Sequence, residues 1–184
     1  MTSVRSDADL TSLPGGYAIR SRLPADDPAL VAIENRASEL FRAHGYGSVA
    51  DASIPDVEAL RAMIAGQDVK VAVDDSSRPV GYAVFGALGE FLHLRELSVD
   101  PRHGRRGLGS ALVGEVIDAA RRGNYAGVSL TTFRDVPFNA PFYRRLGFRD
   151  AELADAPEAL RRRFLAEVPA GIDPARRVLM IASA

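Results

Sequence analysis

One stretch of this 184-residue chain constrains its fold more than any other: a turn rich in glycine and arginine that joins a strand to a helix. The turn reads Gly-Arg-Arg-Gly-Leu-Gly over residues 104–109. The pattern before it predicts a strand over Glu90–Val99, and the pattern after it predicts a helix to about Arg122. The apolar face of that helix consists of Ala111, Leu112, Val116, Ala119 and Ala120. A strand that leads directly into an amphipathic helix is typical of domains in which helices pack on a sheet.

The same turn suits an anionic ligand such as a phosphate. Successive backbone N–H groups in such a turn converge on one point, and the helix N-terminus adds unsatisfied donors and its dipole. Gly107 and Gly109 lack a Cβ, so the backbone is able to approach a ligand closely. The side chains of Arg102, Arg105 and Arg106 add charge-assisted contacts to phosphate oxygens.

Two better-known phosphate motifs do not fit this turn. A dinucleotide-binding fingerprint needs a sixth-position glycine, and counting from Gly107 that position is Leu112. A nucleotide-binding P-loop needs a Gly-Lys-Ser/Thr sequence, which the turn lacks. On the turn alone, a glycine-rich connection without any ligand stays open as an alternative.

The rest of the chain predicts a single α/β domain over residues 17–184 that follows a flexible polar tail over residues 1–16. Further strands are predicted at Tyr17–Ser21, Val69–Val73, Pro79–Ala87, Val128–Phe133, Phe148–Ala151 and Arg177–Ala182. Further helices are predicted from Asp26 to about Phe41, over Pro55–Ala65 behind a capping box of Ser53 and Asp56, from Asn139 to Leu146, and from Asp155 to about Glu167; Gly45–Ala52 is a predicted loop. This order indicates a mixed sheet with helices on its faces.

Composition excludes several classes of function. With 23 basic and 24 acidic residues the net charge is −1, which argues against a dedicated nucleic-acid binder. The absence of cysteine excludes disulfides and thiolate metal sites, and the 3 histidines are scattered, so no metal centre is expected. The N-terminus has no signal-peptide core, and no apolar run is long enough to span a membrane, so a cytoplasmic protein without membrane contacts is expected.

Two segments together resemble one protein family. The segment Leu97–Leu112 resembles the acetyl-CoA-binding motif of GCN5-related N-acetyltransferases (GNAT), [RQ]-x-x-G-x-[GA], and the segment Asn139–Phe148 resembles that family's N…A…FY…LGF signature. One helix and one strand separate the two, as in the family. The first motif position is Gly104 instead of Arg or Gln, so Arg105 or Arg106 is expected to supply the missing charge. The resemblance implies a mostly antiparallel central sheet with helices on both faces, and acetyl-CoA as cosubstrate.

The resemblance also implies roles for individual residues. The strand before the turn would part from its neighbour, and the backbone groups of Leu97, Ser98 and Val99 at its end would contact the pantetheine arm. The turn would hold the pyrophosphate through Gly104, Arg105, Arg106, Gly107, Leu108, Gly109 and Ser110. Asn139 would reach the pantetheine or acetyl end, or alternatively cap the short helix. Phe142 and Tyr143 would lie beside the cofactor, with Tyr143 as the acid that protonates the leaving sulfur or, alternatively, as a core aromatic.

The acceptor amine needs a general base, because at neutral pH it is protonated. Glu96 is the first candidate, His93 on the same strand is the second, and Glu34 on an apolar helix face is the third. Glu34 and Phe41 are also candidates for lining the acceptor site, although each also fits a structural role. The long segment between Phe148 and Arg177 is expected to wall that site together with the first two helices.

Taken together, the residues and the resemblance predict an N-acetyltransferase that acts on a primary amine of a small molecule. A protein or peptide N-acetyltransferase and a non-catalytic acyl-CoA sensor are the alternatives. The presence of Tyr143 counts against the sensor. A monomer or homodimer is expected.

Overall fold

The computed structural model describes residues 11–184, which form one open sheet of eight strands in the order β1-β2-β3-β4-β5-β6-β8-β7. The strands are β1 (Thr11–Ser12), β2 (Ala18–Ser21), β3 (Asp68–Val73), β4 (Pro79–Leu88), β5 (Phe91–Val99), β6 (Gly127–Phe133), β7 (Arg149–Ala151) and β8 (Arg177–Ser183). All neighbours pair antiparallel except β5 and β6, which are parallel. The predicted mixed, mostly antiparallel sheet is therefore confirmed.

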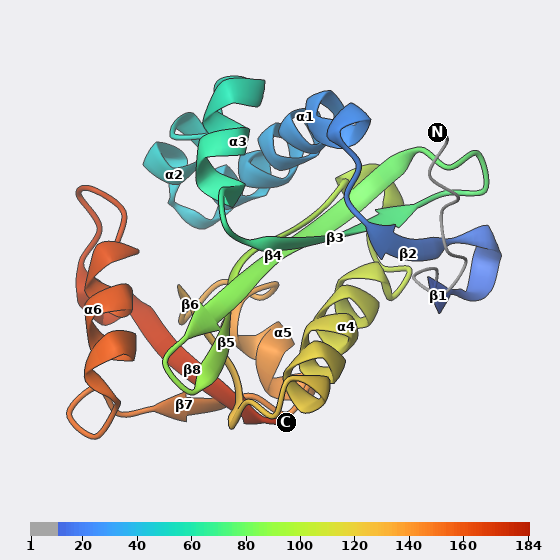
Figure 1. The fold of residues 1–184 in the computed structure, drawn as a ribbon. Coiled ribbons are helices and arrows are strands. Elements are labelled where there is room, and N and C mark those ends of the chain that lie inside the picture. Colours follow the sequence, from blue (N-terminus) through green and yellow to red (C-terminus); the bar gives the residue numbers. More distant parts are fainter. Residues whose placement is uncertain (1–10) are drawn as a thin grey trace.

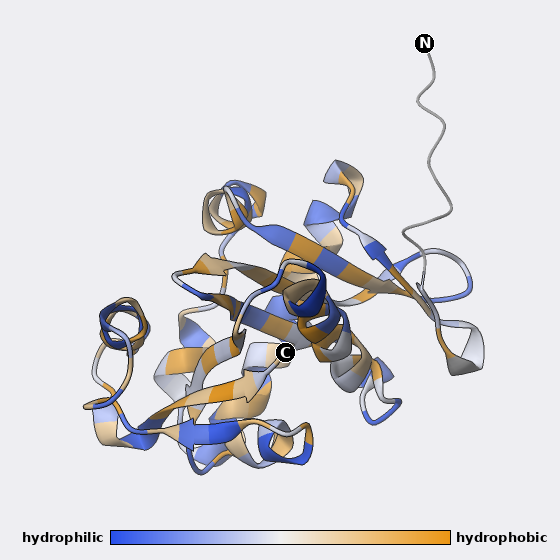
Figure 2. Ribbon diagram, turned by 60° about the horizontal axis from the view of Figure 1, so that its bottom comes forward, coloured by the Kyte–Doolittle hydropathy of each residue, from blue (hydrophilic) through white to orange (hydrophobic). Residues whose placement is uncertain are grey.

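Helices cover both faces of this sheet (Figure 1). They are α1 (Asp27–Ser38), α2 (Gly47–Asp51), α3 (Val57–Ile64), α4 (Leu108–Arg122), α5 (Ala140–Arg145) and α6 (Glu158–Ala166). Helix α4 and α5 side chains pack with Leu94 and Leu130 on one face, whereas α1 and α3 pack with Tyr82 and Val84 on the other. Helix α6 covers Leu179. Polar and apolar residues are mixed along the strands (Figure 2). The central strands β4 and β6 are nevertheless buried along almost their whole length, because helices cover both faces of the sheet.

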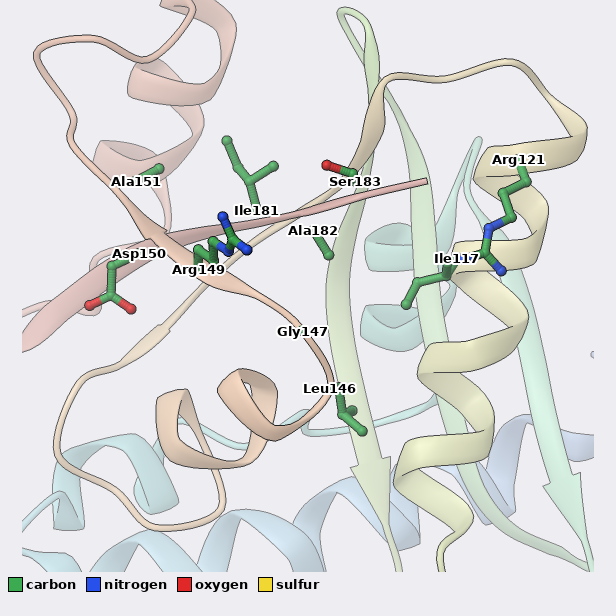
Figure 3. A pocket seen from close by; sticks show the side chains of 10 residues that line it. All are labelled: Ile117, Arg121, Leu146, Gly147, Arg149, Asp150, Ala151, Ile181, Ala182 and Ser183. Carbon is green, nitrogen blue, oxygen red and sulfur yellow. The ribbon is translucent and has the colours of Figure 1, made fainter.

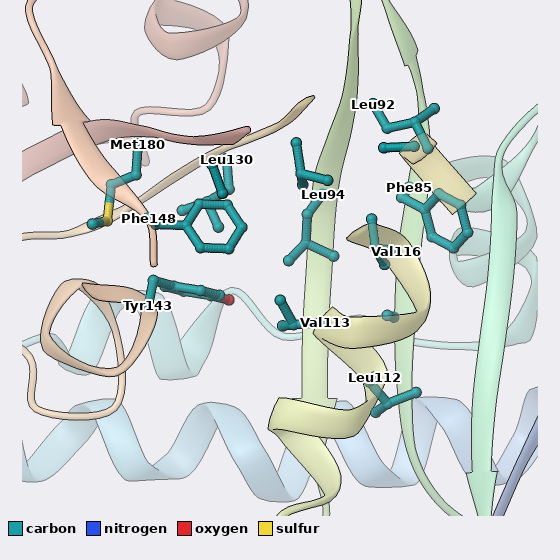
Figure 4. Packing of buried hydrophobic residues seen from close by; sticks show 14 of the residues in the cluster. Phe85, Leu92, Leu94, Leu112, Val113, Val116, Leu130, Tyr143, Phe148 and Met180 are labelled. Carbon is teal, nitrogen blue, oxygen red and sulfur yellow. The ribbon is translucent and has the colours of Figure 1, made fainter. Parts of the chain in front are cut away.

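The core beneath α4 and α5 is tightly packed (Figure 4). Leu94 and Leu130 of the sheet meet Val113 of α4, and Phe148 stacks edge-on against Tyr143 with ring centroids 5.6 Å apart. A buried leucine or phenylalanine contributes about 1.5–3 kcal/mol relative to an exposed one. This packing fixes α4 and α5 relative to β5.

A bulge in β5 changes which side chains share a face. Val84 pairs with Glu96 whereas Phe85 pairs with Leu94, so Arg95 has no partner residue on β4. An extra residue of this kind leaves two consecutive side chains on one side of the strand. Residues directly opposite in an antiparallel pair share a face, so Glu96 lies on the face of Val84, toward α1 and α3.

The parallel ladder between β5 and β6 is short. It runs from Phe91↔Gly127 to Leu94↔Leu130 and then stops, although β5 continues to Val99 and β6 to Phe133. Beyond Leu94, β5 pairs only with β4, and beyond Leu130, β6 pairs only with β8. We call this divergence the fork. The edge of β5 that faces it carries backbone groups without a ladder partner.

Several predicted boundaries need correction. Of the predicted tail, residues 1–10 lie outside the described part of the chain, but Thr11 and Ser12 pair with β2. The first helix ends at Ser38 and continues as a 3₁₀ helix over Glu39–His44, and the predicted loop over 45–52 contains α2. The capping box is also wrong: Asp56 itself caps α3, because its carboxylate accepts from the Ala59 N–H at 2.8 Å.

Candidate active site

The glycine-arginine turn opens α4 at the end of β5, as the sequence predicts. Gly107 is the N-cap with φ 79°, a left-handed conformation that glycine adopts without strain. Arg105 is also left-handed, with φ 59°. The first recorded helical bond from this end is donated by the Ala111 N–H to the Gly107 carbonyl at 2.9 Å. Within residues 11–184 no backbone acceptor is recorded for the amides of residues 105–110, so they are available to an anion.

Gly109 brings three elements of the site together. A Cβ at this position would lie 3.4 Å from the Phe142 ring and 3.9 Å from Val99. The start of α4, the side of α5 and the end of β5 therefore meet at one point. The structure thus brings the predicted cofactor residues of all three elements into one neighbourhood.

The three arginines around the turn are held differently. Arg102 forms a 2.7 Å ion pair with buried Asp100, and Arg106 donates to the Tyr17 hydroxyl at 2.9 Å. Arg105 is exposed and has no recorded hydrogen bond or ion pair among the described residues. Arg105 is therefore the arginine best placed to contact a ligand.

The backbone around Gly104 leaves little room for a side chain at this position. A Cβ there would lie 3.1 Å from the Pro101 carbonyl oxygen, tighter than ordinary van der Waals contact. The Gly104 N–H donates to the same oxygen at 3.1 Å and closes a 3₁₀ turn over Pro101–His103. A side chain at this position would require the turn to shift.

Tyr143 projects from α5 with its hydroxyl toward β5 and α4 (Figure 4). The residue is only 8% exposed, and no hydrogen bond to its hydroxyl is recorded within residues 11–184. Burial, with the nearby Glu96 carboxylate, raises its pKa well above the usual value, although Arg177 opposes the shift. Both alternatives for Tyr143 are thus compatible: the ring is part of the core, and the hydroxyl is a protonated donor without a protein partner.

Asn139 does not cap α5 with its side chain. Its amide nitrogen instead donates to the Thr132 hydroxyl of β6 at 2.7 Å, and no side-chain bond to the start of α5 is present. The alternative of an N-cap side chain is therefore wrong. The bond ties α5 to the β6 arm of the fork.

Glu96 faces the side of the sheet opposite to α4 and α5. Its Oε1 accepts from the Ser98 hydroxyl at 2.9 Å. Burial raises its pKa to about 7, the Ser98 hydrogen bond opposes that rise, and the carboxylates of Glu34 and Glu167 add to it. A carboxyl with a pKa near 7 is poised to exchange a proton at neutral pH.

His93 is buried in a hydrogen-bonded network. Its Nδ1 lies 3.0 Å from the Ser129 hydroxyl, and its Nε2 lies 3.1 Å from Glu167 Oε2. Since both ring nitrogens are engaged, the ring would have to break one of these bonds to accept a proton from an amine. The geometry favours Glu96 over His93 as the base.

Glu34 and Phe41 both have clear structural contacts. Glu34 Oε2 accepts from the Ile54 N–H at 3.0 Å, and burial raises its pKa. The Phe41 ring packs against Phe133 and Phe138, with centroids 5.5 and 5.2 Å away. Glu34 also acts electrostatically on Glu96, so the two carboxyl groups lie near each other.

Two residues of the site were not predicted from the sequence. Glu167 reaches the fork from beyond the end of α6 and accepts from the Thr131 hydroxyl at 2.7 Å. Arg177 of β8 donates to the same hydroxyl at 2.7 Å, and its guanidinium lies over the Phe133 ring at 4.6 Å. Neither belongs to a motif; only the unusual length of the segment between β7 and β8 signalled a contribution from this part of the chain.

One hollow on the described surface lies away from these residues. A cavity of 510 Å³ lies between the C-terminal part of α4 and the β7–β8 edge (Figure 3). It is lined by Ile117, Arg121, Leu146, Gly147, Arg149, Asp150, Ala151, Ile181, Ala182 and Ser183. None of the predicted site residues is among them. Residues 11–184 contain no cluster of His, Asp and Glu side chains suited to a metal ion, and none of their helices combines the length and apolarity that crossing a bilayer needs.

Comparisons with known proteins agree with this geometry. The model of the acetyltransferase (GNAT) family matches residues 35–148, more than half of the chain. The PaiA N-acetyltransferase from Thermoplasma acidophilum, solved with coenzyme A, is 15% identical, with 91% of this chain and 99% of that chain covered and a TM-score of 0.66.

Two further solved structures share the fold. A GCN5-related N-acetyltransferase from Rhodopseudomonas palustris is 20% identical, with 94% of this chain and 99% of that chain covered and a TM-score of 0.69. N-acetylglutamate synthase from Neisseria gonorrhoeae, solved with coenzyme A and N-acetyl-glutamate, is 16% identical, with 94% of this chain but 36% of that chain covered and a TM-score of 0.67.

Proposed function

The chain belongs to the GNAT acetyltransferase family, and from that premise we propose that it transfers the acetyl group of acetyl-CoA to a primary amine of a small molecule. The observation that carries the proposal is the fork. Tyr143 lies on one face of the sheet and Glu96 on the other, and both lie beside the fork. They are close enough to each other for the Glu96 carboxylate to raise the pKa of Tyr143. A proton donor and a proton acceptor thus flank the only place where the central strands part among the described residues.

The residues present fit coenzyme A. Amides 105–110 have no recorded protein acceptor, which suits the two phosphates of a pyrophosphate. Gly109 leaves room for close approach beside Phe142, and the edge of β5 at Leu97 and Val99 offers backbone groups to an extended amide-containing arm. Acetyl-CoA would supply an activated thioester, and the chain's own residues would orient it and manage the protons.

Glu96 serves as the general base in this proposal. An alkylammonium with pKa ~10.4 costs roughly 4–5 kcal/mol to deprotonate at pH 7. The carboxylate of Glu96, whose pKa is about 7, accepts that proton and leaves the amine lone pair free to attack the thioester carbonyl. A positioned base of this kind typically accelerates a reaction by ~10²–10⁴.

Tyr143 serves as the general acid. The carbon–sulfur bond breaks as the carbon–nitrogen bond forms, and the Tyr143 hydroxyl donates its proton to the departing sulfur. Because burial keeps its pKa high, Tyr143 is protonated throughout the neutral range. Its hydroxyl has no recorded hydrogen bond, so it is available for this donation.

The acceptor side of the fork supports a small substrate. Helix α1 and the end of α6 both approach this face, through Glu34 and Glu167 respectively. Elements from two separate parts of the chain on this face would leave less room for a long peptide than for a small amine. A peptide acceptor is the alternative that the experiment must address.

The test is free-thiol release from acetyl-CoA across primary amines, amino acids and short peptides, together with calorimetry of coenzyme A binding. We expect micromolar to millimolar binding of coenzyme A and thiol release with at least one small amine. Folded protein that binds no coenzyme A would overturn the proposal. Turnover confined to peptides would overturn the small-molecule part.

A further inference from the structure

The side of the fork toward α1 and α3, which we call the acceptor face, carries more carboxyl groups than one amine requires. Glu96 lies on this face because it pairs with Val84. Glu34 comes from α1, which packs on the same face, and Glu167 comes from the end of α6. Three carboxylates from three elements therefore approach the same part of this face, and Glu34 and Glu167 each act on the titration of Glu96.

Glu167 is held at the apex of the fork. Its carboxylate accepts from Thr131 Oγ1 at 2.7 Å and lies 3.1 Å from His93 Nε2. His93 is on β5 just before the last ladder pair, and Thr131 is on β6 just after it. The Glu167 side chain is 19% exposed, so it is both anchored and accessible. The bonds from His93 and Thr131 hold its pKa below the usual value against the effect of burial, which keeps it ionised.

The positive charges that face this cluster do not cancel it. One buried guanidinium, that of Arg177, lies near Glu96 and Glu167. Arg163 is 3.8 Å from Glu167 and one-third exposed, and Arg95 points its guanidinium at the Met63 carbonyl, 2.9 Å away. His93 and Tyr82 are further titratable groups on this face, and neither adds a fixed positive charge. The two guanidinium groups of Arg177 and Arg163 against three carboxyl groups leave room for one further positive charge.

A second observation points to a ligand with hydrogen-bond donors. Tyr82 is opposite Ser98 in the β4–β5 ladder, is fully buried, and is influenced by both Glu34 and Glu96. Its hydroxyl oxygen has no hydrogen-bond partner, because the nearby Ser98 hydroxyl is turned toward Glu96. Buried hydroxyls without a partner are uncommon and costly. An ammonium group bound between the carboxylates would supply the missing donor.

We propose that the acceptor carries a second positively charged nitrogen, and that Glu167 is the residue that selects for it. The inference rests on the proposed function. The reacting amine lies at Glu96, and the second ammonium is bound by the carboxylate of Glu167. A hydrogen bond to a charged group, when lost, commonly costs tenfold or more in binding.

The test compares a linear diamine with the monoamine of equal chain length as acceptors, by thiol release from acetyl-CoA. We expect the wild type to favour the diamine in kcat/KM by about tenfold or more. Glu167→Gln should reduce that preference below about threefold, mainly through the KM for the diamine, while the KM for acetyl-CoA stays unchanged. Glu158→Gln is the matched control, since Glu158 is an exposed carboxylate on α6 itself, 3.1 Å from Arg162.

A second variant separates charge from anchoring. Thr131→Val removes a hydrogen bond to Glu167 but keeps its carboxylate, so the preference for the diamine should persist. Equal use of both amines by the wild type, or a preference that survives in Glu167→Gln, would overturn the inference while leaving the acetyltransferase intact. Absence of thiol release with every amine would instead overturn the proposed function.

Discussion

Replacing Glu96 with glutamine should have opposite effects on activity and stability. The substitution keeps the shape of the side chain but removes the proton acceptor, so kcat should fall by ~10²–10⁴. The acidic limb of the wild-type kcat/KM profile should have an apparent pKa of about 7, set by Glu96, and this limb should disappear in the variant. Acetyl-CoA affinity should not change, because the carboxylate is not part of the phosphate turn.

The stability effect follows from the same buried carboxyl. Folding raises its pKa from 4.5 to about 7, chiefly by burial, so the folded state binds this proton more tightly than the unfolded state does. The unfolded state loses the proton first as pH rises, and the wild type therefore loses stability between about pH 4.5 and 7 and stays penalised above pH 7. A pKa rise of that size corresponds to about 3 kcal/mol in the free energy of unfolding. Glutamine avoids the penalty, so the variant should gain up to about 3 kcal/mol at pH 8.5 and almost nothing at pH 4.5.

The measurement is urea unfolding of both proteins at pH 4.5, 6.5 and 8.5, with steady-state thiol release on the same samples. Glu90→Gln, an exposed position just before β5, serves as the control and should change neither quantity. A companion variant, Glu34→Gln, removes a charge that raises the pKa of Glu96, so it should move the acidic limb to lower pH. A Glu96→Gln protein that keeps its activity, or whose stability gain does not grow with pH, would refute the reasoning.

Three other predictions address the donor side and the fold. Tyr143→Phe should lower kcat by ~10²-fold or more without weakening coenzyme A binding, and weaker binding at unchanged kcat would contradict the acid role. Gly109→Val should raise the KM for acetyl-CoA at least tenfold, since its Cβ would already lie 3.4 Å from Phe142; steady-state kinetics with varied acetyl-CoA would show this. Asp100→Asn should lower the free energy of unfolding by about 2 kcal/mol at pH 7. Although burial opposes it, hydrogen bonds from Arg102 and Arg36 hold the pKa of Asp100 well below 3.8, so the wild-type advantage should shrink as pH falls below that value.

Local signals accounted for most of the fold. The turn and α4 are encoded by residues close together in the sequence, namely the glycines at 107 and 109 and the apolar face of the helix. The structure has the turn and the helix where these residues predict them. The errors came where a short-range rule competed with a tertiary contact. Asn139 has the side chain of an N-cap, yet its amide binds Thr132, because β6 brings that hydroxyl within 2.7 Å.

The position of the fork could not be predicted from the residue pattern, although the resemblance implied that the strand parts from its neighbour. No residue pattern predicts where a parallel ladder ends, and the bulge at Arg95 is seen only in the pairing of β5 with β4. The resemblance did not show that Glu96 shares a face with Glu34 and Glu167.

The division of the site between family-matched and other segments explains why the acceptor is harder to predict than the donor. The turn, α5 and Glu96 all lie within residues 35–148, where the family model matches. Glu167 and Arg177 lie outside that segment, yet both bind Thr131 at the fork, on the side where we propose that the acceptor binds. Backbone amides bind a pyrophosphate only where the turn has the right conformation, and the glycines that this conformation needs are visible in the sequence as a motif. In the proposed function, recognition of the acceptor depends on a few charged side chains, and one of them, Glu167, comes from a segment outside the match. It follows that exchange of residues 152–176 between relatives should change amine preference while the KM for acetyl-CoA remains similar.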